Sequence, residues 1–171
     1  MYQSVDQALR AAYKLWAVRI EPLNNTAQIM DWCANKGVLQ GGSDLTQHEH
    51  HANAAMIISR VERVLNRFEL AAVEMQYTGG LKADGIVDLT AFLEEQNKGV
   101  NLLICDDLLM NLFASKPRRI DIMDKYDVSN GYFYRQHNKV KKIIAFLLNQ
   151  AICKLEADFI DVGIIKKIAV A

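Results

Sequence analysis

Hydrophobic residues recur along this chain at alternating intervals of three and four positions, the spacing of the buried face of an α-helix. The clearest stripe runs from Ala54 to Met75 and predicts one long helix with a wide apolar face. A second stripe, from Ser129 to about Phe159, predicts a helix of ~30 residues that Gly163 ends. Because only two prolines and nine glycines interrupt 171 residues, we expect an all-α fold, a helical bundle.

Polar residues ahead of the shorter stripes predict where other helices begin. Ser4, followed three residues later by Gln7, has the form of a capping box and predicts a helix over residues 5–18. A second cap at residues 24–26 predicts a short helix that stops at Gly37.

Glycines divide the chain into two predicted halves. Gly79 and Gly80 end the long helix, and a turn over residues 82–85 follows. This turn is the expected boundary between an N-terminal helical half, residues 1–80, and a C-terminal half, residues 81–171.

The C-terminal half is predicted to contain several shorter elements. They are a helix over residues 91–96, a strongly apolar helix over residues 101–113, a helix that Ser115 caps with Pro117 in its first turn, and an apolar tail over residues 164–170. The tail predicts a small strand or a strap across the bundle.

The chain from Arg118 to Val140 has the form of a helix-turn-helix. Hydrophobic residues that can brace two helices flank a turn over residues 127–129, and they are Ile120, Ile122, Met123, Tyr126, Val128, Phe133 and Val140. Ser129 can cap the second helix by accepting a hydrogen bond from the backbone near Tyr132. In this motif the second helix lies in the major groove of DNA, so we predict a C-terminal helix-turn-helix whose recognition helix is extended.

The positions expected to face solvent carry side chains that suit DNA. Arg pairs with guanine, Asn or Gln pairs with adenine, and Tyr and Lys contact phosphate. The predicted DNA-binding residues are Lys116, Arg118, Arg119, Ser129, Asn130, Tyr132, Arg135, Gln136, Lys139 and Lys142. Gly131 is unfavourable inside a helix, where glycine costs ~1 kcal/mol relative to alanine. Its role in the motif would instead be to let a phosphate approach the backbone closely.

Charge is segregated along the chain. Residues 116–142 contain eight basic and three acidic groups, a net charge of +5, whereas residues 1–115 contain nine basic and fourteen acidic groups, a net charge of −5. The chain as a whole has no net charge, which hides a local basic footprint typical of a phosphate-contacting module. An ordinary helical hairpin with a basic face is the alternative.

Two other groups of residues could serve a site. Arg60, Arg63 and Arg67 line one helix face, either as a second phosphate-contacting surface or, as we favour, as a solvated face paired in part with neighbours such as Glu62, Glu69 and Glu74. His48, His50 and His51 lie beside Glu49, a set that could hold a divalent metal. The pattern is not His-Glu-x-x-His, so we expect no metal, no cofactor and no enzymatic activity.

Cysteine usage and hydropathy bear on location. Cys33, Cys105 and Cys153 are scattered among apolar residues, which favours buried thiols over disulfides or a zinc site. No apolar run approaches the ~20 residues needed to span a bilayer, and the N-terminus lacks a signal pattern. We therefore expect a cytoplasmic protein without a membrane partner.

The C-terminal third resembles two families. Tyr126 to Ser129 with Tyr134, Arg135 and Val140 resembles the sigma-factor region-4 type of helix-turn-helix. The continuation through residues 155–160 is similar to phage late-gene regulators of the antitermination Q type. These resemblances imply binding to promoter DNA and RNA polymerase. One branch of the antitermination proteins carries a four-Cys zinc finger, which this chain lacks.

The function predicted is therefore sequence-directed binding of duplex DNA by a transcription regulator of phage or prophage type. RNA polymerase and a second copy of the chain are further candidate partners. The alternative is a helical interaction protein without a DNA role, which self-associates through the Ala54–Met75 helix.

Overall fold

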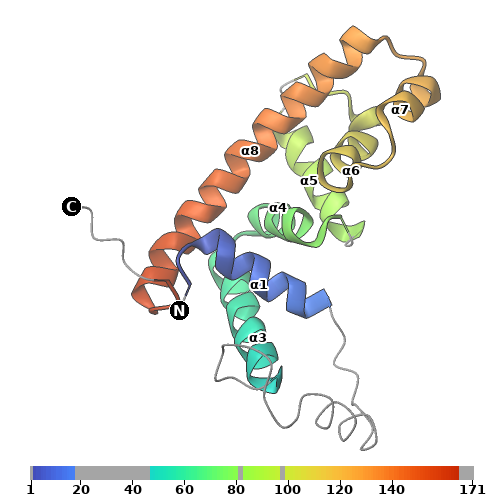
Figure 1. Ribbon diagram of the computed structural model, residues 1–171. Coiled ribbons are helices and arrows are strands. Elements are labelled where there is room, and N and C mark those ends of the chain that lie inside the picture. Colours follow the sequence, from blue (N-terminus) through green and yellow to red (C-terminus); the bar gives the residue numbers. More distant parts are fainter. Residues whose placement is uncertain (1, 18–46, 81–82, 97–98, 166–171) are drawn as a thin grey trace, which may run out of the picture.

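The computed structural model describes residues 2–17, 47–80, 83–96 and 99–165, most of which are helical (Figure 1). The elements are α1 (Val5–Ala17), α3 (Gln47–Val64), α4 (Arg67–Thr78), α5 (Ala83–Glu95), the 3₁₀ turn η1 (Leu102–Ile104), α6 (Cys105–Ala114), α7 (Arg119–Tyr126) and α8 (Asn130–Asp161). The predicted all-α class is confirmed. The predicted tail contributes one isolated parallel bridge, between Ile165 and Tyr2, and then leaves the described residues.

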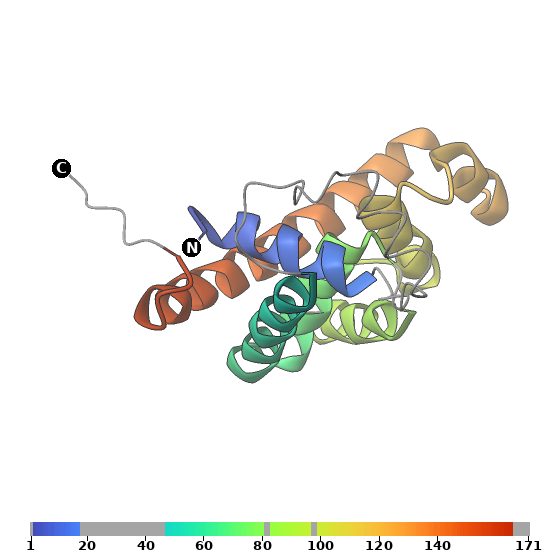
Figure 2. The same cartoon turned by 60° about the horizontal axis from the view of Figure 1, so that its bottom comes forward.

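Helix α8 runs along one side of the molecule, and the other helices lie beside it (Figures 1 and 2). It has 32 residues, and its buried positions recur every three or four residues from Phe133 to Phe159. The prediction of an extended C-terminal helix is therefore confirmed. Gly163, with φ of 76°, follows its end as expected, because glycine adopts this left-handed conformation without steric cost.

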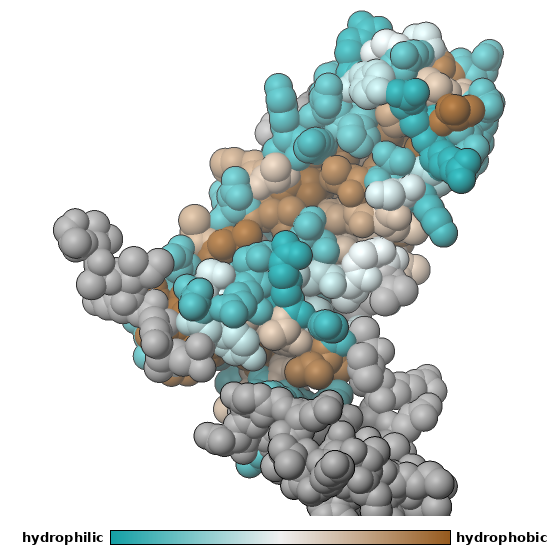
Figure 3. All heavy atoms as spheres, in the orientation of Figure 1, coloured by the Kyte–Doolittle hydropathy of each residue, from teal (hydrophilic) through white to brown (hydrophobic). Residues whose placement is uncertain are grey.

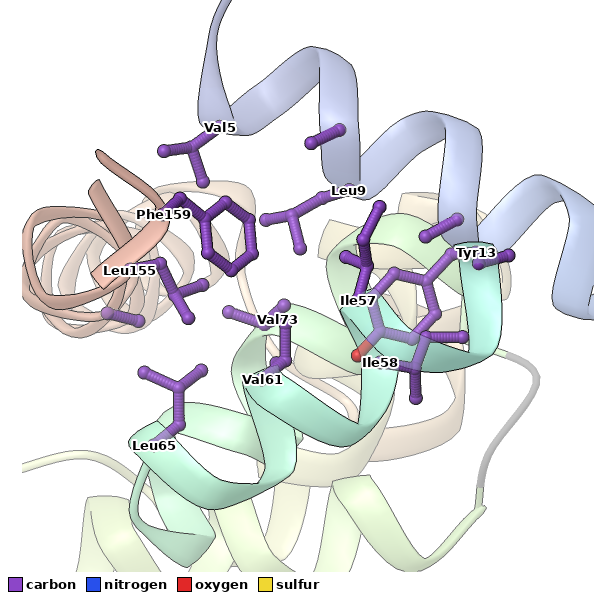
Figure 4. Packing of buried hydrophobic residues seen from close by; sticks show 14 of the residues in the cluster. Val5, Leu9, Tyr13, Ile57, Ile58, Val61, Leu65, Val73, Leu155 and Phe159 are labelled. Atoms are coloured by element: carbon purple, nitrogen blue, oxygen red, sulfur yellow. The ribbon is translucent and has the colours of Figure 1, made fainter. Parts of the chain in front are cut away.

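The C-terminal part of α8 packs in a first hydrophobic cluster with α1, α3 and α4. Leu155 and Phe159 of α8 meet Leu9 of α1, Val61 of α3 and Val73 of α4 (Figure 4). This burial accounts for the wide apolar face that suggested self-association through residues 54–75, because the face is covered within the chain.

The N-terminal part of α8 packs in a second cluster with α4 to α7. Its fully buried members include Leu89, Leu93, Leu108, Leu109, Ile122 and Ile144. Helices α4 and α8 contribute to both clusters, so the packing crosses the predicted boundary near residue 80. The division into two halves stays a prediction.

The predicted single helix from Ala54 to Met75 is wrong, because the chain breaks between α3 and α4. Asn66 has an extended backbone, and its side chain accepts a hydrogen bond from the Glu69 N–H at 2.9 Å. The Glu69 carboxylate accepts one from the Asn66 N–H at 3.1 Å. This capping box satisfies two backbone donors at the start of α4, although the apolar spacing continues unbroken across it.

Glu69 also joins α4 to α8. Its carboxylate, only 3% exposed, lies 2.6 Å from the ammonium group of Lys154. A buried carboxylate needs such partners, because an unpaired one costs several kcal/mol (~3–5) of stability. The capping box and this ion pair together fix the start of α4 against α8.

Helix α5 begins earlier than predicted. It includes residues 83–85, where the sequence predicts a turn, and it runs continuously through residues 91–95, where the sequence predicts a separate helix. Gly85 is tolerated inside this helix because it packs against Met75. A Cβ added at Gly85 would lie 2.9 Å from the Met75 Cγ, so tertiary packing explains the glycine.

Two other helix ends test the predicted caps. Ser4 accepts a hydrogen bond from the Gln7 N–H at 3.2 Å, which confirms the predicted cap of α1. The predicted cap of the helix after Pro117 is wrong, since Ser115 instead ends α6 in the left-handed conformation and Arg118 precedes α7. The Arg118 N–H donates to the Asp121 carboxylate at 3.2 Å.

The remaining predictions concern the helix expected before Gly37 and the three cysteines. The cap at residues 24–26, the helix up to Gly37 and Cys33 lie outside the described residues. Cys105 is buried as expected. Cys153 is exposed, contrary to expectation, because it lies on the side of α8 away from the buried positions Ala151 and Leu155.

We predict that Gly85→Ala lowers the free energy of unfolding by about 1–2 kcal/mol, because the new methyl group overpacks the fully buried Met75. Urea unfolding followed by circular dichroism measures this. Gly131→Ala is the matched control, since nothing lies within 4 Å of a Cβ added there. It should be neutral or stabilising by up to about 1 kcal/mol. Equal effects of the two substitutions would contradict the packing argument.

Candidate nucleic-acid interface

Helices α7 and α8 are joined by the short turn that the sequence predicts over residues 127–129. Asp127 ends α7 in the left-handed conformation, with φ of 49°, and the Val128 N–H donates to the Met123 carbonyl at 3.1 Å. Ser129 then caps α8, because its hydroxyl accepts a hydrogen bond from the Tyr132 N–H at 3.3 Å. The backbone of this turn is thus satisfied locally, which fixes where α8 begins.

Most of the predicted bracing residues lie between the two helices and the core. Ile122, Phe133 and Val140 are buried, and Met123, Tyr126 and Val128 are half-buried. The exception is Ile120, which is 57% exposed. Side chains two positions apart on a helix point in directions that differ by about 200°. Ile120 therefore points away from the core that Ile122 enters.

A short loop that precedes η1 holds the N-terminal part of α8. The Asn101 N–H donates to the Gln136 side-chain oxygen at 3.2 Å, and the Asn101 amide donates to the Tyr132 hydroxyl at 3.0 Å. The Lys139 ammonium group donates to the Gly99 carbonyl at 3.1 Å. Three residues one turn apart on α8 therefore face this loop.

These contacts correct the predicted set of groove-facing residues. Gln136 is only 7% exposed, so the expectation that it faces solvent is wrong. Tyr132 is half-buried, and its hydroxyl already accepts a hydrogen bond. Lys139 is exposed but bends back to the loop. These roles could not be predicted from local sequence, because Asn101 lies 35 residues from Gln136 along the chain.

The other predicted residues are exposed, and the same helix exposes two further polar residues. Asn138 and Lys141 also lie on the solvent side of α8, and Asn138 offers the amide that Gln136 does not. We call the following exposed residues the basic surface: Lys116, Arg118, Arg119, Asn130, Arg135, Asn138, Lys141 and Lys142. Ser129 is exposed too, but its hydroxyl serves as the cap.

An aromatic contact spans the two helices within the basic surface. The Arg119 guanidinium lies 5.4 Å from the centre of the Tyr134 ring and donates a hydrogen bond to the Tyr134 hydroxyl. Cation–π contact of this kind orients the guanidinium without neutralising its charge. Arg119 therefore stays available to an anion.

The ion pairs of the described chain lie outside the basic surface. Within the described chain, none of its six cations forms an ion pair, whereas Arg60, Arg67, Lys125 and Lys154 each contact a carboxylate elsewhere. His137 adds no charge at neutral pH, because burial against Phe133 and the nearby Lys141 lower its pKa. The surface is thus a patch of cations without ion pairs, although Asp121, Asp124 and Asp127 are also exposed in the same segment.

The two competing groups of residues have ordinary roles where they are described. The guanidinium of Arg60 makes two hydrogen bonds with Asp158, at 2.7 and 2.9 Å, and Arg67 pairs with Asp88. The expected partial pairing is observed, but with Asp158 of α8 and Asp88 of α5 in place of Glu62, Glu69 and Glu74. The break at Asn66 also puts Arg60 and Arg67 on different helices. His50 and His51 are half-buried, and the described residues hold no group of three metal-ligating side chains. The His48 side chain lies outside the described part.

Comparison with known proteins adds no family. No protein-family model and no curated protein matches this chain. Among the helices described, none is long and apolar enough to cross a membrane.

We predict that Asn101→Ala destabilises the chain by about 1–3 kcal/mol, because it removes the donor to Tyr132 and the acceptor for the Leu103 N–H. Hydrogen exchange at the start of α8 should rise at the same time. Asn138→Ala is the control, and should stay within about 0.5 kcal/mol of the original chain because the residue is exposed. Indistinguishable effects would show that the loop does not hold the helix.

Proposed function

We propose that this chain binds duplex DNA through the basic surface, with α8 entering the major groove as the second helix of a helix-turn-helix. The observation that carries the proposal is the cluster of six exposed cations without ion pairs, in a chain that pairs cations elsewhere and has no net charge. Phosphate contacts supply most of the affinity of such modules.

The outward side of α8 supplies groups that read bases. Arg135, Asn138 and Lys142 follow one another at intervals of three and four, so they share the face opposite Phe133 and Val140. Arginine pairs with guanine and asparagine with adenine in the major groove. Lys116, Arg118 and Arg119, which flank the start of α7, then contact the phosphate backbone.

The start of α8 suits a phosphate. The first N–H groups of a helix point outward with partial positive charge, and α8 is long. Gly131 lies in this first turn with open space around it, so no side chain stands between a phosphate and the backbone. This supports the role in close approach rather than a packing role.

The biological class that fits this binding is a transcription regulator of phage or prophage type. That part of the proposal, and a contact with RNA polymerase, follow only from the resemblance of residues 126–163 to region-4 and antitermination families. The alternative is an interaction protein without DNA binding, for which the partly exposed strip on α8 described below is the supporting feature.

Two substitutions separate base reading from phosphate contact. Arg135→Ala should relax base preference at one position by about 1–3 kcal/mol, as measured by selection from a randomised duplex library. Lys141→Ala should weaken binding to all sequences and reduce the slope of log K against log salt by about 0.9. Arg10→Ala on α1, 70% exposed, is the control that should change neither. The proposal fails if no duplex competes better than random DNA.

Gly131→Ala provides a second test, because stability and binding should move in opposite directions. The helix gains stability of up to about 1 kcal/mol, since Ala is the better helix former. Affinity for duplex DNA should nevertheless fall several-fold as the methyl group meets the phosphate. Fluorescence anisotropy at low salt, with a urea melt of the same sample, measures both. An unchanged affinity would show that no phosphate approaches the backbone at Gly131.

A further inference from the structure

The middle of α8 exposes a strip without charge. From Ile143 to Cys153 eleven consecutive residues carry no ionisable group apart from the thiol, although Lys141 and Lys142 precede them and Lys154, Glu156 and Asp158 follow. The exposed members, which we call the α8 strip, are Ala145, Phe146, Asn149, Gln150 and Cys153. Phe146 is 62% exposed. Figure 3 shows hydrophobic residues along the middle of α8, between hydrophilic regions.

The strip contains both a projection and a hollow. A shallow groove beside α8 is lined by Asn66 and Glu69 from the start of α4 and by Asn149, Gln150, Cys153 and Lys154, with Phe146 at one end. Phe146 and Cys153 are seven residues apart, so they lie on the same face and about 10.5 Å from each other along the axis. The groove thus extends from Phe146 itself to Cys153 and Lys154, and a two-fold axis midway between Phe146 and Cys153 would bring each ring to the far end of the partner's groove.

We propose that the α8 strip is the contact of a homodimer, in which two copies of α8 pack antiparallel about a two-fold axis between Asn149 and Gln150. A two-fold contact uses one patch twice. With the axis there, Phe146 lies opposite the partner's Cys153 and enters the partner's groove, and the second ring does the same in reverse. Amide side chains meet at the centre.

Charge decides the direction of the two helices. Lys142 lies one turn before Phe146, while Glu156 and Asp161 are exposed near the other end and form no ion pair within the described chain. In an antiparallel pair Lys142 lies beside the partner's Glu156. In a parallel pair it would face the partner's Lys142, which is unfavourable.

The proposed contact covers Asn138, Lys141 and Lys142 of the basic surface and leaves its other members outside, so the dimer and DNA contacts by Asn138 and Lys142 exclude one another. The overlap covers residues 138–161 of each helix, a length of about 36 Å. Arg135 and α7 lie beyond the end of the partner's α8. The inference does not rest on DNA binding, so the dimer is tested without DNA.

Sedimentation equilibrium of the full chain tests the contact. The expected mass is twice the 19.3 kDa of one chain at high concentration, falling to one chain on dilution. Phe146→Asp should give one chain throughout, with an unchanged helical circular dichroism spectrum. Leu103→Asp, at a residue 81% exposed outside the strip, should dimerise like the original chain. A monomer at every concentration, or a Phe146→Asp variant that still dimerises, overturns the proposal.

Cross-linking and charge reversal test the direction. In a Cys33→Ser background, Phe146→Cys should form a disulfide-linked dimer on mild oxidation, and adding Cys153→Ser should abolish it. Lys142→Glu and Glu156→Lys should each weaken the dimer several-fold, and the double variant should restore it. A covalent dimer formed through Cys153 alone, or a double variant weaker than both single ones, would exclude the antiparallel pair.

Discussion

The structure depends on the burial of one face of α8. Eight buried hydrophobic residues spread over its 32 positions belong to the two hydrophobic clusters, so every other described helix either touches this helix or packs on one that does. The shorter helices have 8 to 18 residues, and isolated helices of that size are marginal in water without packing partners. The length of α8 therefore sets the layout, and α4 lies where the two clusters meet.

Polar contacts then fix what the apolar stripe leaves free. Glu69 ties the start of α4 to Lys154 on the C-terminal part of α8, and Asn101 ties the loop before η1 to Tyr132 and Gln136 on its N-terminal part. Each tie includes a buried side chain, Glu69 in the first and Gln136 in the second, where hydrogen bonds are specific because an unmade one is costly. These contacts thus fix the position of α8, which carries much of the basic surface.

The sequence predicted the fold class and the course of α8 well. It failed where a side-chain cap or a contact with a distant segment decides the local structure. The break at Asn66 was hidden by an apolar spacing that continues across it, although the capping pair with Glu69 could have revealed it. Gly85 was interpreted as a turn because its reason, the side chain of Met75, is a tertiary contact. Gln136 and Tyr132 have groove-reading chemistry, but their partner lies more than thirty residues away in sequence.

By itself the sequence determined the helical class, the long final helix, its cap at Ser129 and the segregation of charge, because these follow from local spacing, local hydrogen bonds and composition. Only the tertiary structure decided which polar residues of α8 face outward. Gln136 is buried and therefore leaves the predicted surface, Asn138 joins it, and Phe146 and Cys153 are exposed. The physical reason is that a helix of fixed period has several polar sides, and only the packing of distant segments selects the one that meets solvent.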